Sequence, residues 1–319
     1  MATSKQQFVA SDVIALEVRE GLSASPKWLP SKLFYDQIGS ALFEQITQLP
    51  EYYLTRTERS IFERYAGEIL EQAGTSLTLV ELGAGTATKT CILLEELLRR
   101  QTRALFYPID VSPSALQEAM EQLGRQFPGL RVSPIVADYT GGVAALSRIS
   151  GRKLVLYIGS SIGNFEPDEA VRILRRIRRT LRPGDALLLG ADYAKSTKIL
   201  LPAYDDSQGV TARFNKNILA RLNRELDADF DVDLFRHIPV WNRKESRIEA
   251  YLESTIPQRV FIAALDMDVS LAPGERIHTE ISYKYTDEMI RAILQESGFK
   301  LEYSWRDRQK WFGVHLARA

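Results

Sequence analysis

The sequence predicts an α/β protein whose centre is a doubly wound parallel sheet. From about Ser76 to residue 193, apolar strand-like runs alternate with amphipathic helical stretches, which is typical of a parallel sheet covered by helices on both faces. The C-terminal end differs: a helix is followed by two strands close enough in sequence to pair as an antiparallel hairpin. We therefore expect a mostly parallel sheet with an antiparallel C-terminal hairpin.

The first predicted strand, LTLVELGAG (77–85), is a nearly continuous apolar run that ends in a glycine-rich turn. The other strands of the parallel sheet are predicted at ALFYPIDVS (104–112), RVSPIVADY (131–139), KLVLYIGSS (153–161) and DALLLGADY (185–193). Helices are predicted at CILLEELLRR, at SPSALQEAMEQLGRQF with its Ser-Pro start, and at PDEAVRILRRIRRTLRPG. TDEMIRAILQESG (286–298) predicts the last helix, and KLEYSWRD and KWFGVHLA predict the hairpin strands.

Two stretches of the chain do not follow this alternation. We expect residues 1–65 and 196–285 to form a second domain, beside a sheet domain of residues 66–195 and 286–319. Open α/β sheets bind ligands at the carboxyl ends of their strands. We therefore expect the second domain to cover that edge.

Composition excludes several classes of protein. Lysine and arginine number 41, as do aspartate and glutamate, which argues against nucleic-acid binding through a broad positive charge. One cysteine, Cys91, and three scattered histidines lack the spacing of a disulfide framework or a metal site. The N-terminus lacks a signal-peptide core, and no apolar run approaches the ~20 residues of a membrane span. We expect a cytoplasmic, metal-free monomer that binds neither nucleic acid nor membrane.

A basic cluster lies in the helical segment between Arg172 and Arg182. Val171, Leu174 and Ile177 share one face of that helix, so the arginines are most simply its solvated side. Contact with RNA is the alternative, and it would give a binding affinity that falls steeply with salt.

The sharpest local motif runs from Glu81 to Ala87, ELGAGTA, between a strand and a helix. Gly83 and Gly85 allow a tight turn and a close approach to a ligand. The third glycine of a dinucleotide fingerprint is missing at Thr88, and no GKS or GKT ending marks a phosphate loop. The acid before the glycines suits a ligand with a positive amino group, such as S-adenosylmethionine. A methyl donor is therefore favoured over a dinucleotide.

Two aspartates stand at the ends of the next predicted strands. Asp110 is placed to accept from a ribose diol, although it could equally cap the following helix. Asp138 stands beside Tyr139, where an adenine could be bonded and stacked. Together with Glu81, these carboxylates predict a nucleoside site at the strand ends.

Polar and aromatic clusters without regular periodicity lie outside this segment. They are LPSKLFYDQIGSALFEQITQLPEYYLTRTE (29–58), YIGSSIGNFEPDE (157–169), AYDDSQGVTARFNKN (203–217) and IHTEISYKYT (277–286). Each could be structural, since a tyrosine in an aromatic segment belongs to a core more often than to a ligand site. Glu280 and Ser282 share one face of an alternating strand, which could be its solvated face.

With ELGAGTATKT and SRIEAYLES, these segments resemble the histidine-specific S-adenosylmethionine methyltransferases. That family trimethylates the α-amino group of L-histidine to hercynine, the first step of ergothioneine synthesis. The resemblance runs from about Leu29 to the C-terminus, with FYD..GS, LPEYY.TRTE, GSSIGNF, AYDD..GVTA.FN.N and TEIS.KY in family order. It implies a Rossmann-like class I methyltransferase sheet, S-adenosyl-L-methionine as methyl donor, and a second domain that binds an amino-acid substrate.

The resemblance also implies roles for single residues. It implies that the cofactor is contacted by Gly83, Lys89, Asp110, Asp138 and Tyr139. The glycine motif adds Glu81 and Gly85 to the predicted cofactor-binding residues. Asn164 and Tyr204 are implied to hold the carboxylate and amine of the amino acid, with Tyr35 near the amine. Tyr35 and Asn164 are thus the catalytic candidates, with Tyr35 a candidate proton acceptor.

The same resemblance implies that Tyr52, Glu280 and Ser282 grip the imidazole ring. A carboxylate and a hydroxyl on one strand face can bond both ring nitrogens, and an apolar side chain would leave them unpaired. One departure is Ala250 in SRIEAYLES, where the histidine enzymes commonly carry a methionine against the ring. The smaller residue enlarges the pocket, so tryptophan or another amino acid is the alternative substrate. A non-catalytic nucleoside-binding homologue is a further alternative.

Overall fold

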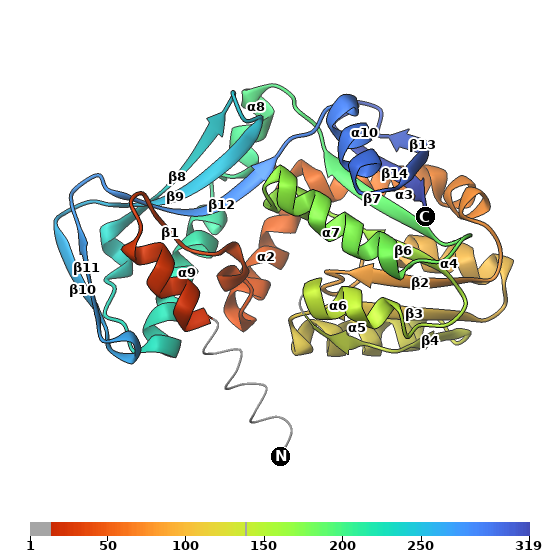
Figure 1. Ribbon diagram of the computed structural model, residues 1–319, viewed down its shortest axis with the longest axis horizontal. Coiled ribbons are helices and arrows are strands. Elements are labelled where there is room, and N and C mark those ends of the chain that lie inside the picture. Colours follow the sequence, from red (N-terminus) through yellow and green to blue (C-terminus); the bar gives the residue numbers. More distant parts are fainter. Residues whose placement is uncertain (1–13, 138) are drawn as a thin grey trace, which may run out of the picture. The chain divides into compact units, whose positions relative to one another are not determined.

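The structure, a computed structural model, describes residues 14–137 and 139–319, and its chain divides into two compact units (Figure 1). The first unit contains the chain up to Tyr52 and Ser196–Ser282, and the second contains Tyr53–Lys195 and Tyr283–Ala319. The sequence placed the first boundary at residue 65. Residues 53–65 instead belong to helix α3 (Tyr53–Ala73), which packs on strand β14 and helix α4 within the second unit.

The second unit is built on an eight-stranded sheet in the order β13-β14-β7-β6-β2-β3-β4, with β5 also pairing with β3. The parallel strands are β2 (Leu77–Leu82), β3 (Ala104–Asp110), β4 (Leu130–Val132), β5 (Ile135–Val136), β6 (Arg152–Tyr157) and β7 (Ala186–Asp192). Strands β14 (Phe312–Arg318) and β13 (Lys300–Arg306) add to β7 in antiparallel fashion. The expected Rossmann-like class I methyltransferase sheet with an antiparallel C-terminal hairpin is confirmed.

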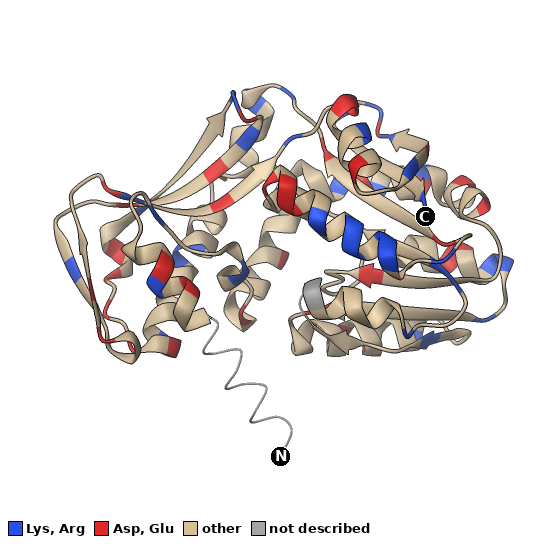
Figure 2. Cartoon of the chain, in the orientation of Figure 1, with Lys and Arg blue, Asp and Glu red and all other residues tan. Residues whose placement is uncertain are grey.

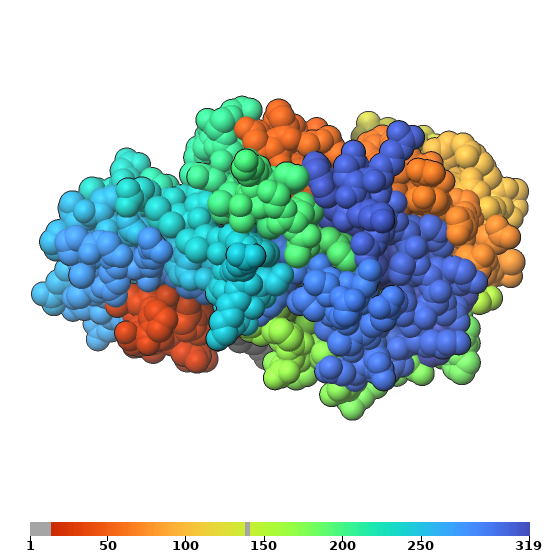
Figure 3. All heavy atoms as spheres, turned by 90° about the horizontal axis from the view of Figure 1, so that it is seen from above, coloured from red at the N-terminus to blue at the C-terminus, as the bar shows by residue number. Residues whose placement is uncertain are grey.

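Helices cover both faces of this sheet, which explains why its first strand is apolar throughout. Every residue of β2 is buried. Its Leu77 and Leu79 join a core with α3, α4 (Cys91–Arg100) and α5 (Pro113–Gln126). On the opposite face lies α6 (Tyr139–Leu146), which contacts α7 (Pro167–Thr180), and α7 contacts α10 (Asp287–Glu296). Figure 3 shows the C-terminal residues in dark blue beside the orange segment that includes α3, although they are far apart in sequence.

One predicted strand differs from the structure. The run 131–139 was expected to form a single strand, but it forms β4 and β5 and then enters α6. Ser133 still donates its amide to the Phe106 carbonyl, at 2.9 Å. Pro134 has no N–H to continue the ladder, so the pairing stops there and resumes at Ile135.

The first unit contains a separate sheet in the order β1-β12-β9-β8. Its strands are β1 (Lys27–Trp28), β8 (Phe235–Asn242), β9 (Arg247–Ser254) and β12 (Arg276–Tyr283), and β10 (Gln258–Ile262) and β11 (Met267–Leu271) form a hairpin beside it in sequence. Its helices include α2 (Gln37–Gln48), α8 (Thr197–Leu200) and α9 (Val210–Leu226). Helix α9 packs on β8, β9 and α2, so the helices and the sheet of this unit share one core.

The arginines of α7 lie on the exposed side of that helix, as Figure 2 shows. Val171, Leu174 and Ile177 are buried on the other side. Arg175 and Arg178 donate to the carbonyls of Glu296 and Gly298, at the end of α10. This cluster is a solvated helix face that also caps a neighbouring helix. Among the described helices, none is long and apolar enough to cross a membrane.

Candidate functional site

The glycine motif forms a turn at the carboxyl edge of the second unit's sheet. Gly83 and Gly85 have φ values of 71° and 51°, which favour glycine. The Gly85 amide donates to Asp110 Oδ2 at 2.8 Å, and the Ser112 amide donates to Asp110 Oδ1 at 2.9 Å. Because β2 and β3 are neighbours, this one carboxylate fixes both the glycine turn and the start of α5.

These residues fit a nucleoside. Each Asp110 oxygen accepts one backbone hydrogen bond and keeps capacity for another, such as a ribose hydroxyl would donate. A side chain at Gly85 would meet no atom within 4 Å, so the space above the turn is open to a ligand. Asp138 lies outside the described residues, and Tyr139 is the first residue of α6.

Glu81 is not presented to solvent at this edge. Its side chain is 2% exposed and accepts a hydrogen bond of 2.7 Å from Thr90 Oγ1. Burial raises its pKa to about 8, since the carboxylate loses its hydration. Burial thus favours the neutral carboxyl, and the predicted contact of Glu81 with the amino group of the methyl donor stays a prediction.

Lys89 and the loop that leads to Asn164 both contact Glu58, a residue that sequence reasoning missed. Lys89 Nζ forms an ion pair with the buried carboxylate of Glu58, which also accepts from the Gly159 amide at 2.8 Å. Asn164, half-buried, ends the 3₁₀ helix η2 (Ser161–Asn164) that follows Gly159. Glu58 stood in the quoted motif LPEYYLTRTE, but no sequence signal marked it as buried.

In the first unit, two of the candidate tyrosines meet the same aromatic ring. Tyr35 lies edge-on to Phe43 with ring centroids 5.9 Å apart, and Tyr52 lies edge-on to Phe43 at 6.2 Å. Phe214 of α9 also lies 5.9 Å from Tyr35. Such edge-to-face contacts hold rings at defined angles.

Tyr204 and Ser282 are also brought together in the first unit. Their hydroxyl oxygens are 2.8 Å apart, and Glu280 shares the Ser282 face of β12 by strand alternation. Ala250 of β9 is 2% exposed, and its carbonyl accepts from the hydroxyl of Thr279 at 3.0 Å. Among the substrate candidates of the first unit, Tyr204 and Ser282 are therefore hydrogen-bonded to each other, and Tyr35 and Tyr52 both contact Phe43.

A buried histidine supports Tyr204. His237 Nε2 donates to the Tyr204 carbonyl at 2.8 Å, and Asn215 Nδ2 donates to His237 Nδ1 at 2.7 Å. Burial lowers the pKa of His237, which keeps the ring neutral and able to accept from Asn215. Sequence reasoning assigned no role to this histidine.

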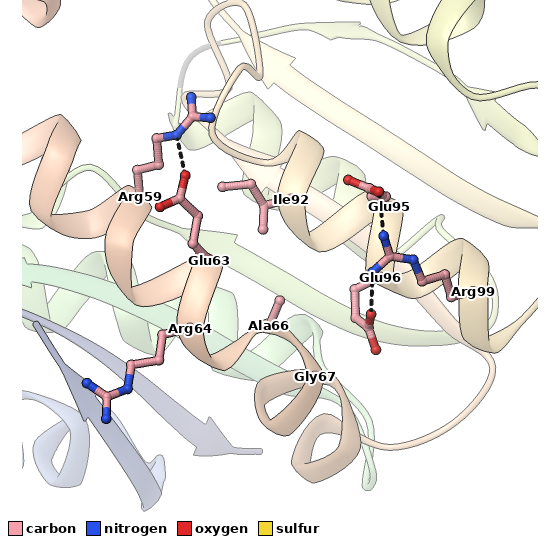
Figure 4. Close-up of a pocket in the computed structure, with 9 residues that line it drawn as sticks. All are labelled: Arg59, Glu63, Arg64, Ala66, Gly67, Ile92, Glu95, Glu96 and Arg99. Carbon is pink, nitrogen blue, oxygen red and sulfur yellow. Dashed lines mark hydrogen bonds and ion pairs between the residues drawn. The ribbon is translucent and has the colours of Figure 1, made fainter.

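A separate groove lies between α3 and α4 (Figure 4), with a volume of about 380 Å³. It is lined by Arg59, Glu63, Arg64, Ala66, Gly67, Ile92, Glu95, Glu96 and Arg99. Two of its arginines pair with neighbouring glutamates, Arg59 with Glu63 at 2.8 Å and Arg99 with Glu95 at 2.6 Å. The groove contains none of the predicted site residues. In the described part of the chain, no group of three or more His, Cys, Asp or Glu side chains could hold a metal ion.

The burial of Glu81 predicts a pH-dependent stability. Folding raises this pKa from 4.5 to about 8. The free energy of unfolding of the protein should therefore fall as pH rises from 4.5 to 8, by at most about 1.4 kcal/mol per pH unit. Glu81→Gln keeps an acceptor for Thr90 and does not titrate. The free energy of unfolding of this variant, measured in urea, should therefore rise relative to that of the wild type as pH increases from 5 to 8.

The matched control is Glu63→Gln on α3, whose side chain is 54% exposed and whose difference from the wild type should stay small at each pH. A difference between Glu81→Gln and the wild type that does not change with pH would contradict the neutral, buried carboxyl.

Known proteins resemble this chain over nearly its whole length. The family model described as histidine-specific methyltransferase, SAM-dependent, matches residues 14–319. Histidine N-alpha-methyltransferase of Mycolicibacterium smegmatis is 44% identical over 308 residues, covering 97% of this chain and 95% of that protein. The Mycobacterium tuberculosis protein of the same name is 42% identical, covering 94% and 93%.

Solved structures are more distant in sequence. An S-adenosylmethionine-dependent methyltransferase from Clostridium acetobutylicum is 14% identical, with a TM-score of 0.44, over 81% of this chain and 91% of that chain. The family assignment follows from the sequence matches, which extend over nearly the whole chain. By these matches, the chain belongs to the histidine-specific, S-adenosylmethionine-dependent methyltransferases.

Proposed function

We propose that this protein transfers methyl groups from S-adenosyl-L-methionine to the α-amino group of L-histidine, three times in succession, to give hercynine for ergothioneine synthesis. The observation that carries the proposal is the 44% identity, over 97% of the chain, to a histidine N-alpha-methyltransferase. The pairing of Tyr204 with Ser282, beside Glu280, supports it. We further propose that the enzyme works as a cytoplasmic monomer, in which the single cysteine, Cys91, stays a free thiol.

The second unit would hold the donor. Gly83 and Gly85 let the backbone approach it, Asp110 accepts from its ribose hydroxyls, and Lys89 contacts it from the start of α4. Asp138 and Tyr139 are proposed to contact its adenine. When bound, the donor supplies a methyl group on a sulfonium sulfur, which needs an in-line approach by a neutral amine.

The first unit would hold the ring of the amino acid. Tyr52, Glu280 and Ser282 are proposed to bond the imidazole, and Ser282 is linked through its hydroxyl to Tyr204. Tyr204 and Asn164 are proposed to hold the carboxylate and the amine. A hydroxyl both donates and accepts, so this pair can serve a ring nitrogen and a carboxylate together.

No strong base is needed for the transfer. A free α-amino group has a pKa of about 7.7–8.0, so a useful fraction of the substrate is neutral near pH 7. The main task of the protein is then to align the nitrogen lone pair, which Asn164 and the tyrosines would do by fixing the amine at near-attack distance. Tyr35 would accept the released proton, directly or through water.

The decisive experiment is a turnover assay of the purified protein against the standard amino acids, with mass detection of one, two and three added methyl groups. Histidine should give the highest kcat/KM and a trimethylated product. The second candidate function is methylation of tryptophan, which Ala250 favours by leaving more room than a methionine. Preference for tryptophan or another amino acid would replace the histidine proposal, and no turnover with any of them would favour a non-catalytic homologue.

Removing the proposed imidazole partners should affect substrate use alone. Glu280→Ala combined with Ser282→Ala is expected to lower kcat/KM for histidine at least ~100-fold, because the ring nitrogens lose their hydrogen bonds. Binding of S-adenosylhomocysteine should survive. Asp268→Asn, on the exposed end of the β10–β11 hairpin, serves as the control. Undiminished histidine turnover in the double variant would refute the imidazole assignment.

Removing the carboxylate at the end of β3 should weaken the cofactor site. Asp110→Ala takes away the proposed ribose acceptor and the partner of the Gly85 amide, so S-adenosylhomocysteine should bind at least ~10-fold more weakly by calorimetry. Asp168→Ala, exposed in the first turn of α7, should bind normally. Wild-type affinity in Asp110→Ala would rule out the ribose role.

A further inference from the structure

Glu58 is a fully buried charged group that the proposed function has not used. Its side chain, in the second turn of α3, is 0% exposed. One carboxylate oxygen forms the ion pair with Lys89, and the other accepts from the Gly159 amide at 2.8 Å. A carboxylate out of water is costly unless such partners satisfy it.

The surrounding backbone leaves room for this carboxylate. A methyl group added at Gly190, in β7, would overlap Glu58 Oε1. At Gly159, φ is +76°, and a methyl group there would come 3.2 Å from Lys89 Nζ. The absence of side chains at Gly190 and Gly159 therefore leaves the space that Glu58 and Lys89 occupy.

The two partners of Glu58 belong to two different loops. Lys89 lies in the segment between the glycine turn and α4, which we propose contacts the methyl donor. Gly159 begins the loop that ends at Asn164, which we propose contacts the amine. The carboxylate is therefore a bridge between a donor loop (residues 83–89) and an acceptor loop (residues 159–164).

Other contacts make the acceptor loop rigid beyond Gly159. Ser160 Oγ accepts from the Asp192 amide at 2.9 Å, and Tyr285 Oη donates to the Ile162 carbonyl at 3.2 Å. A loop tied in this way transmits the position of its first residue to its last. The placement of Gly159 by Glu58 consequently bears on Asn164.

We propose that Glu58 is a positioning residue, which holds the donor loop and the acceptor loop in a fixed relation before either ligand binds. The inference rests on the proposed function and adds to it a group that touches neither substrate nor donor. Its effect is to align the reacting groups in advance, and displacements of about 1 Å are known to cost on the order of 100-fold in rate.

The test uses Glu58→Gln, which has the same shape but lacks the charge that pairs with Lys89. Glu63→Gln, on the exposed side of the same helix, is the matched control. Four quantities are measured: the Kd of S-adenosylhomocysteine by calorimetry, the KM of the donor, kcat, and Tm. We expect the Kd and the donor KM to rise at least ~10-fold and kcat to fall at least ~10-fold, with the control unchanged.

A purely structural role would give a different result. It would lower Tm and the fraction of active enzyme, and hence kcat, while the Kd and KM of the folded fraction stayed at wild-type values. That result would overturn the proposal. Glu58→Asp is the second variant, because it keeps the charge but is one methylene too short to reach both partners. If neither variant folds, Glu58 is needed for folding and the proposal fails.

A double-mutant cycle with Lys89→Met tests whether Glu58 affects donor binding through Lys89 or whether the two residues act independently. If Glu58 acts on the donor through Lys89, Glu58→Gln should add little to the loss of S-adenosylhomocysteine affinity already caused by Lys89→Met. Full additivity would contradict that route. Because the calorimetry needs no amino acid, failure of histidine turnover in the wild type would remove the proposed substrate without deciding the donor-side result.

Discussion

The site proposed for the second unit depends on carboxylates that fix the backbone at the carboxyl ends of its strands. Asp192, at the end of β7, is 0% exposed; it accepts from Tyr53 Oη at 2.6 Å and pairs with Lys284 at 2.9 Å and with Lys195. Asp110, half-buried at the end of β3, holds the glycine turn, and Glu58, buried in α3, holds the Gly159 loop. A buried charge tolerates little movement of its partners, so each carboxylate fixes the backbone around it.

The two units supply different chemistry to the proposed reaction. The second offers backbone amides, a lysine and carboxylates, which suit a charged nucleoside donor. The first offers tyrosine rings and hydroxyls held by a neutral histidine, which suit an aromatic amino acid. His237 contributes by orienting the Tyr204 backbone. Its lowered pKa favours the neutral ring, whose one N–H, on Nε2, makes this hydrogen bond.

Much of the fold could be predicted from the sequence, because apolar runs and amphipathic periods report directly on burial. The strands at 77–82 and 186–192 and the C-terminal hairpin follow from those patterns. The apolar run at 131–139 predicts one strand, but Pro134 within it has no N–H to donate and divides the pairing with β3. Glu81 and Glu58 could not be understood in this way. Whether a carboxylate is neutral, paired or solvated is decided by residues distant in the chain, such as Lys89 for Glu58.

The chain crosses between the two units three times, which limits where the units could be exchanged between related proteins. The crossings fall at 52/53, 195/196 and 282/283, and Tyr53, Lys195 and Lys284, which stand at or next to these points, all contact Asp192. The first unit therefore combines a segment that precedes the second unit with a segment, Ser196–Ser282, that is inserted within it, so neither unit is one continuous stretch. A chimaera that exchanges the first unit between relatives must therefore keep Tyr53, Lys195 and Lys284 from the same parent as Asp192, so that their contacts with its carboxylate are preserved.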